Sequence, residues 1–187
     1  MDVTNTFVNY ALGIKEALET MPISKIEQAV KILRAARRHG KRVFICGNGG
    51  SASTAAHMAC DLSKNAANDY QPDIKAINLA DNMALITAYA NDIGYENIFD
   101  YQLYPMLQAG DVVIGISTSG QSYNVFLALR YAQNAGAKTI AFTGLSGGTL
   151  AGVSDVLVNV PSTCIEQVED LHLILEHLIT TILREDR

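Results

Sequence analysis

The sequence has few cysteines, no excess of positive charge and no long apolar run, and each of these absences excludes a class of protein. Cys46, Cys60 and Cys164 are odd in number and form no Cys-x-x-Cys motif, which predicts free thiols in a reducing compartment rather than a disulfide framework. No run reaches the roughly 18 apolar residues of a membrane span, and residues 1–5 do not resemble a signal peptide. We therefore expect a cytoplasmic protein that has no membrane partner.

The balance of charge argues against nucleic acid as a partner. The chain carries 14 Lys and Arg against 19 Asp and Glu, for a formal net charge of -5 at pH 7, whereas a phosphate backbone is bound chiefly by clustered cations. The basic cluster in residues 34–42 lies at a predicted helix end, where it forms a solvated face favoured by the helix dipole. We expect no direct binding of nucleic acid.

Short apolar runs alternate with stretches of helical periodicity along the whole chain. The predicted strands are residues 41–46, 74–80, 111–117, 138–144 and 155–160. The predicted helices with clear bounds are residues 2–20, 82–91, 95–107, 123–135 and 165–184. Another predicted helix begins at Ser24, its N-cap, and ends at residues 39–40. One more follows the glycines at residues 47–50.

This alternation predicts the fold class. The predicted strands are nearly continuous in apolar residues, which is typical of parallel strands buried on both faces. We expect an α/β fold, a doubly wound, flavodoxin-like parallel sheet of about five strands with helices on both faces. One domain should span residues 1–187, with the helices of residues 2–39 packing on it or on a partner subunit.

A glycine turn leads from the first predicted strand into a helix. Gly47, Gly49 and Gly50 let the backbone turn sharply and approach a ligand. The unpaired N–H groups at the start of the following helix bind anions, above all phosphate. His57 and Asp61 follow at a spacing of i, i+4 and therefore project from the same helix face.

Two other interpretations of this stretch stay open. The glycines can serve packing alone, with His57 and Asp61 as a local pair. The turn also fits a loose dinucleotide fingerprint, with Asp81 as the acid for a ribose. It lacks the Gly-Lys-Ser/Thr of a nucleotide-triphosphate loop, which excludes kinase and ATPase chemistry of that type.

A second polar loop, Ser117-Thr-Ser-Gly-Gln-Ser122, follows the third predicted strand. Its hydroxyls and successive N–H groups can hold a phosphate, although Ser119 or Ser122 as an ordinary helix N-cap explains the loop equally well. Because the carboxyl ends of parallel strands share one edge of a sheet, this loop and the glycine turn should lie together there. Two anion-binding loops on one edge indicate one phosphorylated ligand.

The last predicted helix carries a core stripe and a polar strip. Its apolar stripe consists of Val168, Leu171, Leu175, Leu178, Ile179 and Ile182. His172 lies inside this stripe, which is typical of a core histidine. Glu169 and His177 lie on a different strip, at i and i+8, and are either surface residues or part of a site.

These motifs together resemble the sugar isomerase (SIS) domain family, most closely its phosphoheptose isomerase branch, from about residue 41 to the end of the last helix. The resemblance implies that sugar phosphate is bound by Asn48, Gly49, Gly50, Ser51, Asn91, Asp92, Ser117, Thr118, Ser119, Ser122 and Glu169. It implies a zinc ion surrounded by His57, Asp61, Glu169 and His177. Contacts from Tyr95 and Tyr123 would select the sugar.

The resemblance also implies a reaction and an assembly. The family converts sedoheptulose 7-phosphate to a heptose 7-phosphate, with Asp61 here as the base and His177 as its partner, and it forms tetramers with sites between subunits. Two departures stand out, because the family's usual glutamate is Asp61 here and its usual glutamine is Glu169. The shorter Asp61 bears on catalysis, and the added carboxylate favours zinc. A rival is a non-catalytic SIS protein of the replication-initiator-associating type, which senses sugar phosphates.

Overall fold

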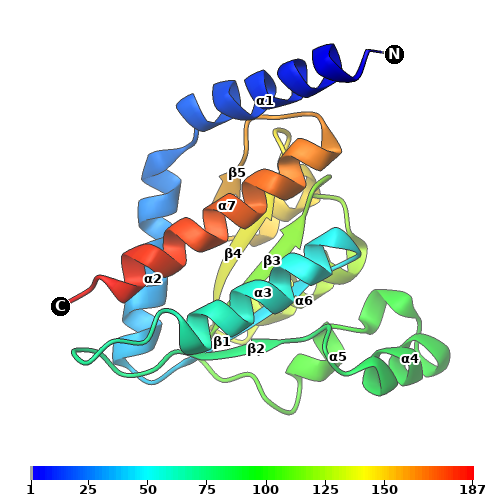
Figure 1. Ribbon diagram of the computed structural model, residues 1–187. Helices are drawn as coiled ribbons and strands as arrows, with labels where there is room; N and C mark the ends of the chain where they lie inside the picture. Colours follow the sequence, from blue (N-terminus) through cyan, green and yellow to red (C-terminus); the bar gives the residue numbers. More distant parts are fainter. Residues whose placement is uncertain (1) are drawn as a thin grey trace.

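The computed structural model describes residues 2–187, and its centre is a five-stranded parallel sheet (Figure 1). The strands are β1 (Arg42–Gly47), β2 (Lys75–Asn78), β3 (Val112–Ser117), β4 (Lys138–Thr143) and β5 (Val156–Asn159), in the order β2-β1-β3-β4-β5. In β1, the second strand of this order, Ile45 pairs with Asn78 on one side and with Ile114 on the other. The strand order reverses between β1 and β3, so the loops that follow these two strands lie at the switch point where such sheets bind ligands.

Helices cover both faces of the sheet, which confirms the predicted doubly wound architecture. The helices are α1 (Val3–Glu19), α2 (Ile23–Arg38), α3 (Gly50–Lys64), α4 (Met83–Asp92), α5 (Asp100–Leu103), α6 (Tyr123–Asn134) and α7 (Ile165–Arg184), with 3-10 turns η1 (Tyr95–Asn97) and η2 (Gly148–Val153). One core cluster joins α2, α3 and α7 to the sheet, and another joins α4, α5 and α6 to its opposite face. Among the described residues, every helix is too short or too polar to cross a membrane.

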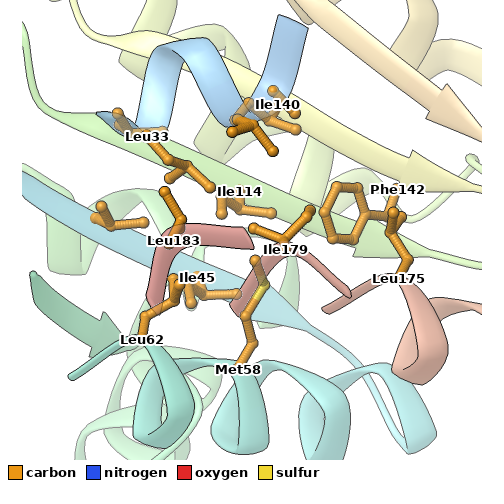
Figure 2. Close-up of a cluster of buried hydrophobic side chains, with 14 of the residues drawn as sticks. Leu33, Ile45, Met58, Leu62, Ile114, Ile140, Phe142, Leu175, Ile179 and Leu183 are labelled. Atoms are coloured by element: carbon orange, nitrogen blue, oxygen red, sulfur yellow. The ribbon is translucent and has the colours of Figure 1, made fainter. Parts of the chain in front are cut away.

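The core beneath α3 and α7 fixes the positions of these two helices. Figure 2 shows Met58 of α3 and Leu175 and Ile179 of α7 pointing toward Ile45 and Phe142 of the sheet. All five side chains are fully removed from solvent, and burying each contributes roughly 1.5–3 kcal/mol. Polar residues that lie on the outer sides of α3 and α7 are therefore held on a rigid frame.

The start of α2 differs from the sequence prediction. Ser24 does not cap α2, because the helix begins at Ile23, with Pro22 in the capping position and without a side-chain cap bond. Proline suits a helix start, since the N–H that it lacks would have no partner there.

The prediction of a single helix over residues 95–107 is wrong. Only η1 and the short α5 form in this segment. Gly94 precedes them with φ of 105°, and Pro105 follows α5 without an N–H to donate into a further helical turn. Gln102 instead donates side-chain hydrogen bonds to the carbonyls of Leu79 and Ile98, at 2.9 and 2.6 Å, and ties the segment to the sheet.

Helix α1 lies across the beginning of α7 and presents much of its apolar surface to solvent (Figure 1). Tyr10 Oη donates a hydrogen bond to Asp170 of α7 over 2.6 Å, and Ala17 is buried. Phe7, however, is 71% exposed and Leu18 is 42% exposed. The predicted amphipathic helix is therefore present, but its apolar stripe is largely uncovered within one chain.

His172 is a core histidine, as its place in the apolar stripe of α7 predicts. It is 1% exposed, and its ring lies 6.2 Å from that of Phe142 between centroids. Burial lowers the pKa of His172 to about 4. The folded protein therefore keeps the imidazole neutral at pH values where the unfolded chain already binds a proton.

Replacing His172 by leucine should remove a pH dependence of stability. Between pH 8 and pH 5 the imidazole of His172 binds a proton in the unfolded wild type but stays neutral in the folded protein. The free energy of unfolding of the wild type should therefore fall by about 2 kcal/mol relative to that of His172→Leu. Urea denaturation of both proteins at both pH values measures this difference, in which all other titrating groups cancel. A difference that does not change with pH would mean that folded His172 binds a proton.

Candidate active site

Helices α3 and α7 lie side by side and run in the same direction (Figure 1). At their beginnings, a Cβ placed on Gly50 would lie 2.5 Å from Glu169 Oε1. Seven residues further along both helices, His57 Nδ1 lies 3.8 Å from Glu176 Oε1. The pair thus has two levels, one at the glycine turn and one about 10 Å further along the helix axes.

Four titratable side chains converge at the second level. His57 and Asp61 come from α3, and Glu176 and His177 come from α7; each offers a ligand atom, and these atoms lie within 4.8 Å of one another. His57 Nε2 lies 3.4 Å from His177 Nε2, and Asp61 lies 3.8 Å from the first and 3.9 Å from the second. His57 and Asp61 are therefore more than a local pair of one helix.

The two carboxylates of the cluster are buried while the two histidines reach solvent. The side chains of His57 and His177 are 45% and 50% exposed, whereas that of Asp61 is 8% exposed and that of Glu176 fully buried. Asp61 Oδ1 accepts a hydrogen bond from Asn65 Nδ2 over 2.7 Å. Within residues 2–187, neither oxygen of Glu176 has a hydrogen-bond partner.

The environment of Glu176 fits a bound cation. Burial, and after it the negative charge of Asp61, raise the pKa of Glu176 to about 7. A buried carboxylate without partners is costly unless a positive charge compensates it. Two imidazoles and two carboxylates are a donor set that suits zinc, so the residues present fit a metal ion.

The glycine turn is tied to the start of α6 by a small amide network. Gly49 adopts φ of 56° and caps α3. The side chains of Asn48 and Asn124 exchange two hydrogen bonds of 2.9 Å, and Tyr95 Oη donates to Asn48 Oδ1 over 2.8 Å. Tyr95 therefore lies at the turn, as expected, whereas Asn124 gave no signal in the sequence because a single buried asparagine at a helix start has an ordinary local explanation.

The serine loop follows β3 at the same edge of the sheet. Ser122 occupies the N-cap of α6 but makes no capping bond, since its hydroxyl pairs with that of Ser117 over 2.9 Å. Ser119 Oγ accepts from the N–H of Gln121 over 3.1 Å. Ser122 is therefore the N-cap by position, but its hydroxyl is not the capping group.

A cavity of about 530 Å³ opens beside the serine loop. Its walls include the loop itself, the segment after β4 and the segment before α7. The lining polar residues are Thr118, Ser119, Gln121, Ser146, Ser162 and Thr163. Thr118, Ser119 and Gln121 belong to the serine loop, whereas Ser146, Ser162 and Thr163 lie on loops without a recognisable motif.

Comparison with known proteins identifies the family. The family model described as SIS domain matches residues 6–144. The phosphoheptose isomerase of Aliarcobacter butzleri is 35% identical over 181 residues, 97% of this chain and 95% of its own length. That of Sulfurimonas denitrificans is 39% identical over 164 residues, 88% of this chain and 84% of its own length. The chain belongs to the SIS domain family, in its phosphoheptose isomerase branch.

Solved structures of the family agree with this assignment. The phosphoheptose isomerase of Neisseria gonorrhoeae superposes with a TM-score of 0.88 at 30% identity, covering 97% of this chain and 96% of the other. Asp81, the acid of the dinucleotide interpretation, accepts a hydrogen bond from the side chain of Asn78.

The SIS fold brings some of the predicted site residues together and leaves others apart. His57, Asp61 and His177 share the cluster, and Asn48, Gly49, Gly50 and Ser51 lie at the switch point with the serine loop. Glu169 lies against Gly50 rather than in the cluster. Asn91 and Asp92 are exposed at the end of α4, where Asn91 Nδ2 donates to Asp92 Oδ1 over 2.8 Å.

Glu176 is the residue of the cluster that sequence reasoning missed. It belongs to a second polar strip of α7, formed with His172 and Thr180 at i, i+4 and i+8, and all three side chains are buried. A run of polar residues at helical spacing beside an apolar stripe is a detectable signal. It marks a buried polar face, which needs partners from another element.

Proposed function

We propose that this protein is a phosphosugar isomerase that interconverts sedoheptulose 7-phosphate and D-glycero-D-manno-heptose 7-phosphate. The observation that carries the proposal is the juxtaposition of Asp61 and His177, which come from different helices with side-chain atoms 3.9 Å apart. The names of the relatives supply the substrate and the reaction class. A non-catalytic sugar-phosphate sensor would not need this pairing.

Asp61 is the proposed base. An aldose–ketose exchange requires a proton to leave the carbon beside a carbonyl, and a carboxylate that faces the reacting carbons can take it. His177 donates and accepts the accompanying proton on the oxygen side through Nδ1, the ring nitrogen that would not hold the metal, so the reaction passes through an enediolate. The hydrogen bond from Asn65 to Asp61 Oδ1 holds the carboxylate in one orientation.

The loops at the switch point bind the rest of the substrate. The phosphate is held by the hydroxyls and N–H groups of residues 117–122, together with Ser51 at the start of α3. The sugar lies along the glycine turn, between Asn48 and Glu169. Asn91 and Asp92 complete the pocket in an oligomer whose sites lie between subunits.

Zinc is the proposed metal. His57, Asp61 and His177 would hold it with a carboxylate of α7, for which the family resemblance offers Glu169. Bound zinc supplies Lewis acidity that polarises the sugar oxygens. The orphaned oxygens of Glu176 and the two exposed imidazoles support a metal at this position.

The assembly we propose is a cytoplasmic homotetramer of single SIS domains. The free thiols of all three cysteines support a reducing compartment. The exposed apolar residues of α1, among them Val3 at 82% and Phe7 at 71% exposure, support burial of this helix against a partner subunit.

Incubation of the pure protein with sedoheptulose 7-phosphate tests the proposed activity. We expect aldose formation that a chelator abolishes and that added zinc restores, because zinc polarises the reacting oxygens. Light scattering on the same preparation should give four times the mass of one chain. One zinc per chain without turnover on this sugar would favour the sensor. Full turnover in chelator would remove the metal from the mechanism.

A further inference from the structure

The metal cluster contains a carboxylate that the family motif does not supply, Glu176, and its side chain is the most deeply buried of the four. Glu176 is fully buried between α7 and α3, and among the described residues no well-formed hydrogen bond reaches either of its oxygens. Its Oε1 lies 3.1 Å from His177 Nε2 and 3.8 Å from His57 Nδ1. A charge in such a place needs a cation that side chains alone do not provide here.

Glu169 is at the wrong level of the helix pair for this task. It precedes Glu176 by seven residues on the same helix, which is about 10 Å along the axis. Its carboxylate covers Gly50, the first residue of α3, while the histidine pair lies at the level of His57. That position faces the glycine turn, where the sugar is proposed to bind.

Building on the zinc site proposed above, we infer that Glu176, not Glu169, is the α7 carboxylate that holds the metal. Ligand atoms around a tetrahedral zinc lie about 3.4 Å apart, given bonds of about 2.1 Å. The separations of 3.4 Å between His57 Nε2 and His177 Nε2 and of 3.1 Å between Glu176 Oε1 and His177 Nε2 are close to this spacing, and the third, 3.8 Å between Glu176 Oε1 and His57, is measured to the other ring nitrogen, Nδ1.

This assignment separates the metal ligands from the base. Two histidines and one glutamate form a three-ligand set of the kind that catalytic zinc sites use, with a further position open to substrate. The assignment also takes Asp61 out of the ligand set proposed above: Asp61 lies 3.8 and 3.9 Å from the two histidines, and its Oδ1 already accepts a hydrogen bond from Asn65. With Glu176 as the ligand, the shorter carboxylate of Asp61 is free to take the substrate proton, and Glu169 is free to contact the sugar.

Metal affinity of matched variants tests the inference without relying on turnover. Zinc titrations of the metal-free full-length protein should show Glu176→Gln binding more than about 100-fold more weakly than the wild type. Glu169→Gln removes the same charge from the same helix and should bind zinc within about threefold of the wild type. Loss of affinity in Glu169→Gln with retention in Glu176→Gln would overturn the inference and leave the proposed isomerase intact.

Thermal unfolding of Glu176→Leu gives a second, independent test. Leucine fills the buried position without an unpartnered charge, so the metal-free variant should melt above the metal-free wild type. Zinc at 100 times its Kd should raise the Tm of the wild type by about 5–10 °C and leave that of Glu176→Leu unchanged. A lower Tm of the metal-free variant, or an equal zinc response, contradicts the inference. A wild type that binds no zinc would overturn both the inference and the zinc site, while turnover in chelator would still report on the isomerase.

Discussion

Asp61→Asn should lower the turnover of sedoheptulose 7-phosphate by about 100- to 10,000-fold, the range that a positioned general base contributes. Asparagine has the same size and keeps the oxygen that accepts the hydrogen bond from Asn65, but it cannot take a proton. Because we assign metal binding to His57, His177 and Glu176, zinc affinity should change far less than turnover. Steady-state rates and zinc titrations of the same preparation measure the two effects separately.

Two further substitutions make this result specific to Asp61. Asp61→Glu keeps a carboxylate on a longer side chain and should recover part of the lost turnover. Asp73→Asn removes the same charge from an exposed residue before β2, and it should leave both turnover and zinc affinity at wild-type values. If Asp61→Asn turned over within a few-fold of the wild type, Asp61 could not be the base.

The architecture follows from local features of the sequence. The central strand β3 is a short apolar run buried along its whole length, and the helix of residues 165–184 is found with the predicted bounds because its apolar stripe is uninterrupted. Prediction fails where tertiary contacts override periodicity. In residues 95–107 the side chain of Gln102 bonds two backbone carbonyls, and Pro105 ends the short helix, so helical spacing alone misleads there.

The sequence pattern predicts only some of the residues of the candidate site. The i, i+4 spacing of His57 and Asp61 predicts a shared face, and family motifs add His177. Neither source selects Glu176, since its role depends on α7 lying parallel to α3, which places it opposite His57. The order of residues along one helix cannot specify which of two glutamates faces a neighbouring helix, because that depends on the relative translation of the two helices.

Gly120→Ala should lower the Tm by roughly 5–15 °C and weaken binding of the sugar phosphate. Gly120 lies in the serine loop with φ of 67°, a conformation that alanine adopts only with strain. An added Cβ would lie 2.3 Å from the carbonyl oxygen of Gly147. The backbone of the serine loop and that of Gly147 must therefore shift apart. Left-handed strain and overpacking together cost about 2–5 kcal/mol.

The contact that Gly120 makes with η2 also explains why affinity should fall together with stability. The Gly120 carbonyl accepts hydrogen bonds of 3.2 Å from the N–H of Leu150 and from Thr149 Oγ1, so a shifted loop loses the anchors that orient the hydroxyls of Ser117 and Ser122. Gly152→Ala in η2 is the matched control, since a Cβ there meets no atom within 4 Å and should leave Tm and KM unchanged. Thermal unfolding and KM for sedoheptulose 7-phosphate measure both variants. A Gly120→Ala protein with wild-type Tm would show that the serine loop can separate from η2 without loss of stability. The rigidity of the serine loop could then not account for phosphate binding.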